Sequence, residues 1–257
     1  MAKPIKLHWS RSKPNFGDAL SPLLCEAISG RKVIYAKPAK ADMIAIGSLL
    51  HRLKEAWFTH RVHVWGTGYI EQPQVHKSRH HYHAIRGQLS ASAISNQQID
   101  TLGDPGLLAG VLLPEEKRLN KKYRIGLVAH YKDKSNPLIK SLIDRHSDIC
   151  EIDIFSPPLS FLQQLSQCEI ILSSAMHGLI AADALGIPNG WIKLSESLRG
   201  NDFKFQDYYS IFKMSPSAIV LEQESIYQQA ESVAEHYERA DIEHIKSRLI
   251  RAFPCDL

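Results

Sequence analysis

An α/β fold built on parallel sheets is predicted by the order of apolar and polar segments along the 257-residue chain. Short apolar runs end in glycine, serine or arginine and are followed by stretches with helical spacing. Strands that alternate with helices in this way are joined by crossovers, which connect parallel neighbours. The pattern occurs before and after a charged break at residues 114–122, so we expect two doubly wound domains, residues 1–116 and 117–257.

The first half begins with an apolar segment at residues 5–9, which a polar loop separates from a predicted helix at 19–28. Asp18 stands where an N-cap is expected, and Gly30 follows the helix as a stop signal. Further strands are expected at residues 43–46, 62–65 and 82–85.

The second half repeats this logic after a strand at residues 123–129. Helices are expected at residues 137–146, 158–167 and 177–185, and strands at 149–155, 170–172 and 191–194. Residues 224–251 are strongly helix-forming, and we expect this terminal helix to return to the N-terminal domain.

The composition is that of an ordinary globular protein, with 44% hydrophobic and 23% charged residues. This balance excludes a disordered or collagen-like chain. No apolar run approaches the roughly 18 residues that would span a bilayer, and the first residues lack the apolar core of a secretory signal, so we expect a cytoplasmic protein. The four cysteines are far apart and suggest reduced thiols rather than disulfides or a zinc site: Cys25, Cys150, Cys168 and Cys255.

The charge balance favours anionic partners only mildly. Lys and Arg number 31 against 27 Asp and Glu, which gives a formal net charge of +4, and 13 histidines add charge as the pH falls. The densest basic cluster, at residues 117–124, lacks the interleaved aromatic residues of a nucleic-acid surface and is interpreted as a solvated linker. We therefore expect no nucleic-acid partner.

One local pattern predicts an anion site. The apolar strand at residues 170–172 ends in Ser173 and Ser174, and the helix that follows begins near Met176 and His177. Backbone N–H groups of a helix start, two hydroxyls and an imidazole then converge on one point. Alternatively, the serines are helix caps and His177 is a surface residue, and the pattern alone leaves both interpretations open.

Two other strand ends carry charged side chains. Asp18 follows Gly17 at a strand-to-helix turn, where a carboxylate can act as an acid or base or simply cap the helix. Arg86 follows a strand and could clamp a phosphate or carboxylate in bidentate fashion, or form a structural ion pair. The many histidines between residues 60 and 83 do not show metal-ligand spacing, because neighbours on an extended segment point to opposite faces. We expect no metal.

Taken together, several segments resemble the polysaccharide pyruvyl transferase family, especially its short exopolysaccharide members. The matching segments are residues 15–22, 46–51, 64–68, 86–90, 102–105, 130–131, 173–188 and 203–209. They occur in the family's order over nearly the whole chain. The chain departs from the family at Gln88 and Ala129, where proline is usual, and at Met176, where leucine is usual.

The resemblance implies transfer of a pyruvyl group from phosphoenolpyruvate to two hydroxyls of a saccharide, which forms a ketal and releases phosphate. It also implies a GT-B-like pair of Rossmann-like domains facing a cleft. Phosphoenolpyruvate is then a substrate, and no cofactor is expected. By position, Asp18 and His177 are the expected catalytic residues, and the expected substrate-binding residues are Arg86, Ser173, Ser174, Met176, His51 and Lys204.

The resemblance leaves the acceptor open. A lipid-linked saccharide at the inner membrane surface would make the protein peripheral to the membrane, whereas a finished polymer would not. The oligomeric state is also open. Two other functions remain: a glycosyltransferase that uses a nucleotide-sugar donor on the same fold, and a non-catalytic saccharide-binding or scaffold protein.

Overall fold

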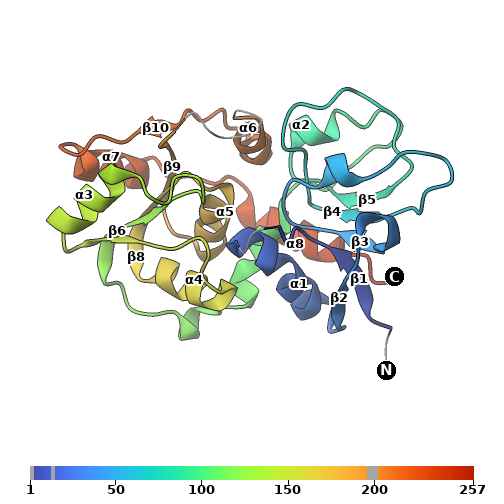
Figure 1. The fold of residues 1–257 in the computed structure, drawn as a ribbon, viewed down its shortest axis with the longest axis horizontal. Helices are drawn as coiled ribbons and strands as arrows, with labels where there is room; N and C mark the ends of the chain where they lie inside the picture. The colour runs from blue at the N-terminus through green and yellow to red at the C-terminus, as the bar shows by residue number, and fades with distance from the viewer. Residues whose placement is uncertain (1–2, 13–14, 196–201) are drawn as a thin grey trace. The chain divides into compact units, whose positions relative to one another are not determined.

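The structure, a computed structural model, describes residues 3–12, 15–195 and 202–257 (Figure 1). The chain forms two compact units. Unit 1 comprises Met1–Leu108, Arg199–Ser215 and Ala240–Leu257, and unit 2 comprises Ala109–Leu198 and Pro216–Arg239. Residues 13–14 of the loop predicted after the first strand lie outside the described residues.

Unit 1 contains a five-stranded parallel sheet in the order β2-β1-β3-β4-β5. Its strands are β1 (Ile5–His8), β2 (Val33–Tyr35), β3 (Met43–Ile44), β4 (His63–Trp65) and β5 (His81–Ala84). After β2, the chain crosses to the other side of β1, so the strand order reverses between β1 and β3. In open α/β sheets, ligands bind outside the carboxyl ends of the strands at such a reversal.

The helices of unit 1 are α1 (Phe16–Ser29), α2 (Gln88–Ala91), α6 (Phe203–Tyr209) and α8 (Ile242–Arg251), with short 3₁₀ turns η1 (Pro38–Lys40), η2 (Leu50–Arg52) and η5 (Ser210–Phe212). On α1, Phe16, Leu20 and Leu24 are buried at a spacing of four residues, which places them on one face of the helix. Gly30 ends α1 with a φ of 65°, as predicted from its position.

Unit 2 contains a second five-stranded parallel sheet, in the order β10-β9-β8-β6-β7. Its strands are β6 (Tyr123–Val128), β7 (Ile149–Glu151), β8 (Cys168–Ser173), β9 (Asn189–Lys193) and β10 (Ile219–Val220). Its helices are α3 (Pro137–Arg145), α4 (Pro158–Ser166), α5 (Met176–Leu185) and α7 (Ile226–Glu235), and the 3₁₀ turns η3 (Pro105–Val111) and η4 (Glu115–Lys117) precede β6. The strand order reverses between β6 and β8.

Alternate residues of the second sheet face opposite layers of helices. Ile125 and Leu127 of β6 share a core with Leu142 of α3 and Ile226 of α7. On the other side, α4 and α5 pack against β8. The expected α/β class with two doubly wound, Rossmann-like units is thus confirmed.

The predicted terminal helix is two helices that belong to different units. Tyr237 and Arg239, in the break between α7 and α8, both bind the buried carboxylate of Asp183 in unit 2, at 3.0 Å each. In unit 1, by contrast, Trp65 Nε1 donates to the carbonyl of Leu249 on α8 at 2.9 Å. A single straight helix cannot serve both sets of contacts, and only the second part, α8, returns to unit 1.

The charged break at residues 114–122 is attached to unit 2. Leu119 N donates to Ser166 Oγ at 3.1 Å, and Lys122 N donates to the carbonyl of Gln167 at 2.8 Å. The chain first passes from unit 1 to unit 2 between Leu108 and Ala109, eight residues before the predicted boundary between residues 116 and 117.

The four cysteines are free thiols. Cys150 Sγ and Cys168 Sγ lie 3.6 Å apart, above Gly126 of β6, which has no side chain to separate them. The 3.6 Å between the two sulfur atoms is well above the roughly 2.05 Å of an S–S bond, so the thiols are not joined.

Among the described residues, none of the helices has the length and apolar character needed to cross a bilayer.

Close backbone packing at Gly87 generates a testable prediction. A Cβ at this position would lie 1.8 Å from the carbonyl oxygen of Asp207, so α2 and α6 meet there without room for a side chain. We expect Gly87→Ala to lower the free energy of unfolding by about 3 kcal/mol or more, because backbone atoms must move. Urea denaturation measures this change.

Gly110→Ala is the matched control, since its added Cβ would lie 3.4 Å from the nearest atom, an ordinary contact. Equal stability of the two variants would show that α6 does not pack as closely as described.

Candidate active site

Asp18 lies at the strand-order reversal of unit 1, in the first turn of α1. The N-cap is Asn15 rather than Asp18, which corrects the prediction from sequence: Asn15 Oδ1 accepts from Asp18 N at 3.0 Å. Asn15 Nδ2 also donates to the Asp18 carboxylate. The Asp18 side chain is thereby released from capping and is oriented by its neighbour.

Burial raises the pKa of Asp18 from 3.8 to about 6, although hydrogen bonds from Asn15 and Ser10 and the charge of Arg52 oppose the shift. A Cβ added to Gly47 would lie 3.8 Å from Asp18 Oδ1, so the carboxyl group is close to the loop that follows β3. A carboxyl group with this pKa can donate a proton near neutral pH and accept it back.

The guanidinium of Arg86 is buried and is bound by other groups of unit 1. The side chain is 0% exposed, and Nη2 forms an ion pair with Asp207 Oδ2 at 2.8 Å. Nε donates to the same oxygen at 2.9 Å, Nη1 donates to Ser48 Oγ at 2.7 Å and Nη2 donates to the carbonyl of Tyr69 at 2.5 Å. The structural ion pair, one of the two interpretations left open by the sequence, is the one observed.

The Arg86 guanidinium packs directly on the backbone of Gly68, where an added Cβ would lie 2.6 Å from Cζ. On the far side of the ion pair, Asp207 accepts from Ser90 N at 2.7 Å and from Ser90 Oγ at 2.6 Å. The sequence analysis did not identify Asp207 as a candidate site residue. Its signal was present, because it lies in the segment 203–209 that matched the family.

Asp104 is a second buried carboxyl group of this region. Burial raises its pKa from 3.8 to about 7, while the Gly106 N–H, the charge of Arg86 and the Gly47 N–H lower it and the charge of Asp207 raises it. Oδ1 accepts from Gly106 N at 2.8 Å, and the buried Oδ2 has no hydrogen-bond partner among the described residues. One cation, Arg86, thus lies near two carboxyl groups.

The remaining predicted residues of unit 1 are His51 and Lys204. His51 lies exposed on η2, seven residues after the end of β3. Lys204 is half-buried on α6, with Nζ 5.1 Å from the ring centroid of Phe205.

In unit 2, Ser173 and Ser174 end β8 beside β6, at the second reversal of strand order. Both are fully buried. Ser173 Oγ donates to the carbonyl of Ala175 at 2.8 Å and accepts from Ala175 N at 3.1 Å. Their hydroxyls therefore shape the turn, and the N-cap itself is Ala175.

Ser174 connects this turn to the loop after β6. Its Oγ accepts from His130 N at 2.9 Å and contacts Asp133 Oδ2 at 3.4 Å, while Ser195 Oγ donates to Asp133 Oδ1 at 2.5 Å. Asp133 is 6% exposed and was also missed from the sequence. It lies five residues after the end of β6, in the loop before α3.

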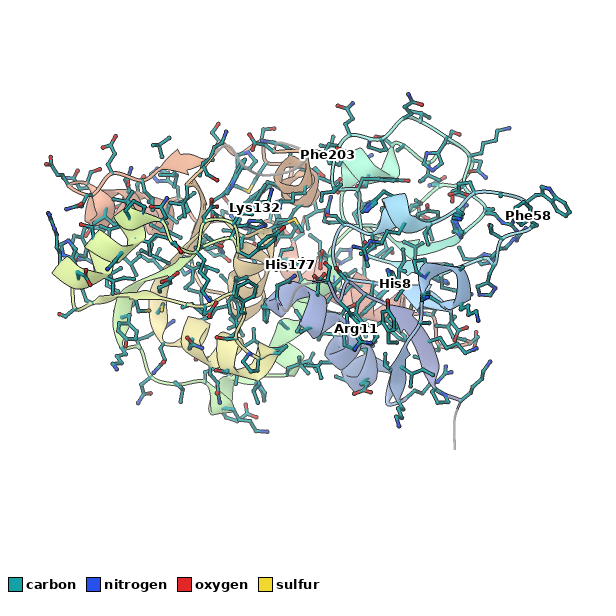
Figure 2. All side chains as sticks on the ribbon, viewed as in Figure 1. His8, Arg11, Phe58, Lys132, His177 and Phe203 are labelled. Carbon is teal, nitrogen blue, oxygen red and sulfur yellow. The ribbon has the colours of Figure 1, made fainter. Side chains whose placement is uncertain are left out.

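His177 lies half-buried on the first turn of α5, beside buried Met176 (Figure 2). The next residue, Gly178, allows the helix to approach the strand end closely, since an added Cβ would lie 2.4 Å from Ser173 Oγ. The structure thus brings four predicted residues together at the start of α5: Ser173, Ser174, Met176 and His177. A helix start of this kind favours an anion.

The histidines of β4 and β5 interact with one another. His63 Nδ1 and His83 Nε2 lie 2.8 Å apart, and burial together with the neighbouring imidazoles lowers the pKa of His63 to about 4. Within the described ranges, no group of three or more His, Cys, Asp or Glu side chains is arranged to hold a metal ion.

Comparisons with known proteins point to one family. Residues 4–195 match the polysaccharide pyruvyl transferase family. An uncharacterized protein of Acanthamoeba polyphaga mimivirus, L143, is 28% identical over 216 residues, covering 82% of this chain and 75% of that protein. The succinoglycan biosynthesis protein ExoV of Rhizobium meliloti is 26% identical over 204 residues, covering 78% of this chain and 62% of ExoV, less than two thirds of its length.

Among solved structures, an uncharacterized protein of Klebsiella pneumoniae matches with a TM-score of 0.45 and 11% identity, covering 85% of this chain and 93% of that one.

The buried ion pair generates a prediction for Arg86. Removing one partner leaves the Asp207 carboxylate buried without its cation, so we expect Arg86→Ala to lower the free energy of unfolding by about 3–5 kcal/mol. Chemical denaturation measures the loss. Arg251→Ala, at an exposed position of α8, is the control and should change stability by less than about 0.5 kcal/mol. A stable Arg86→Ala variant would mean that the pair does not hold α6.

Asp104 generates a prediction for pH. Because its pKa is raised from 3.8 to about 7 in the folded protein, the folded state binds this proton more tightly than the unfolded state. The stabilisation is full below about pH 4 and is lost as the pH rises to about 7. We therefore expect the parent protein to lose stability relative to Asp104→Asn over this range, by a few kcal/mol in order of magnitude.

Denaturation of both proteins at several pH values gives the difference between their free energies of unfolding. The contributions of the other titrating groups are common to both proteins and cancel in this difference. A difference that is independent of pH, or that grows in the opposite direction, would contradict the raised pKa of Asp104.

Proposed function

Because the chain belongs to the polysaccharide pyruvyl transferase family, we propose that it transfers a pyruvyl group from phosphoenolpyruvate to two hydroxyls of a saccharide. The product is a cyclic ketal, and inorganic phosphate is released. The family match over residues 4–195 carries this proposal, and the similarity to a succinoglycan biosynthesis protein supports a polysaccharide as the acceptor class.

The proposed reaction begins with protonation of the methylene carbon of phosphoenolpyruvate. Asp18 is the proposed acid, because burial keeps its pKa at about 6 and the group is therefore partly protonated near neutral pH. As the carbon–carbon double bond takes up the proton, a saccharide hydroxyl bonds to the neighbouring carbon. The resulting Asp18 carboxylate then accepts the proton that this hydroxyl releases.

The second step closes the ketal ring. A second hydroxyl of the saccharide bonds to the same carbon as the carbon–oxygen bond to phosphate breaks. Phosphate leaves with the bonding electron pair and takes up the proton that this hydroxyl releases. The phosphate group needs hydrogen-bond donors in both steps. We assign this role to His177 and the start of α5, which combine an imidazole with the N–H groups of a helix N-terminus.

Arg86 acts in this proposal as a positioning residue. Its bonds to Ser48 and to the carbonyl of Tyr69 hold the loops that follow β3 and β4, and these loops border the region of Asp18. We assign no metal and no cofactor to the reaction, since the donors named above can balance the phosphate charge. The cytoplasm, where phosphoenolpyruvate is made, is the proposed location.

The activity is tested directly by incubating the protein with phosphoenolpyruvate and candidate oligosaccharides. We expect a gain of one pyruvyl unit by mass spectrometry, with one phosphate released for each saccharide modified. Omission of phosphoenolpyruvate is the control. If no acceptor gains mass, and a nucleotide-sugar donor instead gives a glycosylated product, the assignment of pyruvyl transfer is wrong.

The separate roles of Asp18 and His177 predict different defects. Asp18→Asn should lower kcat by about a hundred- to ten-thousand-fold and remove the decline in parent activity expected above about pH 6, because the proton donor is lost. His177→Ala should mainly weaken phosphoenolpyruvate binding, by about ten- to a hundred-fold. Steady-state kinetics and calorimetry measure the two effects.

The matched controls are Asp144→Asn and His236→Ala, which change exposed residues of the same types. Full turnover by Asp18→Asn, or unchanged donor affinity of His177→Ala, would refute the role of that residue without affecting the family assignment.

A further inference from the structure

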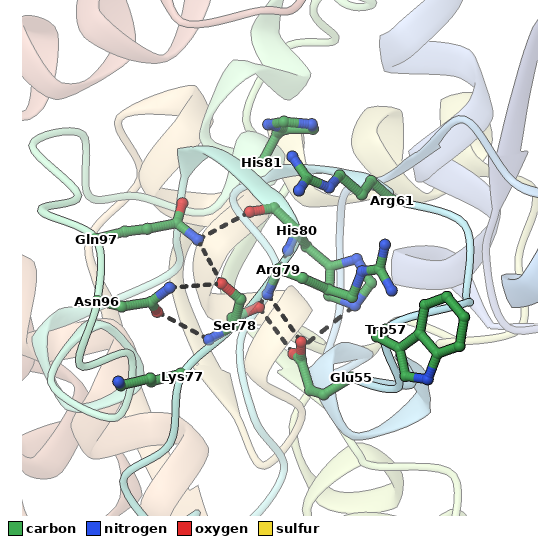
Figure 3. A pocket seen from close by; sticks show the side chains of 10 residues that line it. All are labelled: Glu55, Trp57, Arg61, Lys77, Ser78, Arg79, His80, His81, Asn96 and Gln97. Carbon is green, nitrogen blue, oxygen red and sulfur yellow. Dashed lines mark hydrogen bonds and ion pairs between the residues drawn. The ribbon is translucent and has the colours of Figure 1, made fainter.

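A basic pocket of about 590 Å³ lies in unit 1, away from the residues discussed above (Figure 3). Its walls come from residues 55–61, 77–81 and 96–97. The first two segments lead into β4 and β5, so the pocket lies at the amino ends of these parallel strands. Arg86 follows the carboxyl end of β5. The pocket and the candidate active site therefore lie at opposite ends of the same sheet.

The pocket is formed by cross-linked loops. Asn96 Oδ1 accepts from Ser78 N at 2.8 Å, and Asn96 Nδ2 donates to the carbonyl of Ser78 at 2.9 Å. Gln97 Nε2 donates to the carbonyls of Ser78 and His80, both at 2.9 Å. These amide contacts, drawn as dashed lines in Figure 3, fix the segment that carries Lys77 and Arg79.

Glu55 ties the second loop to the first. Its carboxylate accepts from Ser78 Oγ at 2.8 Å and from Arg79 N at 2.9 Å. The Arg79 guanidinium in turn donates to the carbonyl of Ala56, next to Trp57. Both Glu55 oxygens are therefore bound by donors of the protein, and the loop with Trp57 is held in place.

The pocket has an excess of positive charge and of hydrogen-bond donors. Arg61, Lys77 and Arg79 line it together with one carboxylate, that of Glu55. In the described part of the chain, neither Arg61 nor Lys77 forms an ion pair with an acidic residue. The buried Nε of Arg79 likewise has no hydrogen-bond acceptor there. Such a set of donors fits an anion.

His80 adds a buried donor. Its side chain is 1% exposed, and Nδ1 accepts from Val62 N at 3.2 Å, which places the proton of the neutral ring on Nε2. Among the described residues Nε2 has no hydrogen bond of normal length: Glu55 Oε1 lies 3.7 Å away. The charge of Glu55 and the backbone of Lys54 oppose the lowering of the His80 pKa by burial. A buried donor without an acceptor is costly unless a ligand or water satisfies it.

Trp57 supplies an aromatic surface at the edge of the pocket. It is 86% exposed and packs edge to face against Phe58, with ring centroids 5.8 Å apart (Figures 2 and 3). The negative face of an indole attracts the C–H groups on the apolar face of a sugar ring. The exposed ring can contact the apolar face of a sugar, and the neighbouring cations can pair with a carboxylate. An acidic saccharide offers both of these groups.

We propose that this pocket binds a segment of acidic saccharide, and specifically, on the basis of the proposed function, a segment that already bears pyruvate ketals. Each transfer places one carboxylate on a sugar, and Arg61, Lys77 and Arg79 match that carboxylate. The four-residue strand β5 separates the pocket from Arg86 by about 13 Å. Asp18 lies beside the loop that follows β3, which is two strands from β5 in the sheet, so the distance from the pocket to Asp18 is greater. A ligand that reaches both is therefore a chain of several sugars, and the acceptor class is a long saccharide rather than a single unit.

The concave, polar walls favour a saccharide over an anionic membrane. Side-chain amides of Asn96 and Gln97 line the pocket beside the cations, whereas a bilayer surface is bound by protruding apolar and basic groups. Exposed Phe58 and Trp57 nevertheless make vesicle binding an outcome that the test must include.

The test measures binding in the absence of phosphoenolpyruvate. The probes are a pyruvylated exopolysaccharide oligosaccharide and the same oligosaccharide after mild acid has removed its ketals. We expect the pyruvylated probe to change tryptophan fluorescence and to bind at least ten-fold more tightly than the stripped probe. The fluorescence change should be lost in Trp57→Ala, where calorimetry still reports the remaining affinity.

Arg61→Ala/Lys77→Ala should weaken binding of the pyruvylated probe at least ten-fold, since both cations are exposed and removable without unfolding the protein. Lys32→Ala/Lys40→Ala, which removes two exposed charges of unit 1 outside the pocket, should bind as the parent does. Circular dichroism before each titration establishes that each variant is folded.

The proposal is overturned if both probes bind equally, if neither binds, or if the two double variants behave alike. It is also overturned if phosphatidylcholine vesicles containing phosphatidylglycerol bind through Arg61 and Lys77 while the oligosaccharides do not. Because no donor is present, absence of pyruvyl transfer in the activity assay would refute the proposed function and leave this measurement intact.

Discussion

The ion pair between Arg86 and Asp207 is the interaction on which the carboxyl edge of the first sheet depends. Both side chains are fully buried, so their charges are acceptable only because each satisfies the other and nearby polar groups supply the remaining hydrogen bonds. The pair attaches α6, which follows β9 of the second sheet in sequence, to the loops of unit 1. Gly68 and Gly87 allow this approach because neither has a Cβ that would fill the space.

The same pair determines how the neighbouring carboxyl groups ionise. Arg86 faces Asp207 directly, so Asp207 offsets most of the charge that Arg86 would otherwise exert on Asp104. Burial is therefore the largest influence on the pKa of Asp104, which it raises. Asp18 is less enclosed and is bound by Asn15, which leaves its pKa between the ordinary value and that of Asp104. Three carboxyl groups of one region thus serve as ion-pair partner, buried neutral acid and proposed proton donor, according to their surroundings.

The two ends of the first sheet differ in the chemistry that they offer. At the carboxyl ends, Arg86 and Asp207 are buried and paired within the protein, and burial raises the pKa values of Asp18 and Asp104. At the amino ends, Arg61 and Lys77 are exposed, and Trp57 lies open beside them. Parallel strands produce this separation, because all connections that enter the sheet meet at one end and all that leave it meet at the other.

The sequence by itself determined the α/β class, most strands and helices, and the Gly30 helix stop. It also placed Asp18, Ser173 and His177 where strands lead into helices. All of these features depend on local periodicity and short-range backbone geometry. It also carried the family resemblance. Only the tertiary structure decided that Arg86 pairs with a residue 121 positions away, that Asn15 rather than Asp18 caps α1, and that the terminal helix breaks before α8. Partner choice among charged side chains depends on which of them are buried together, and burial is a property of the packed chain rather than of any segment.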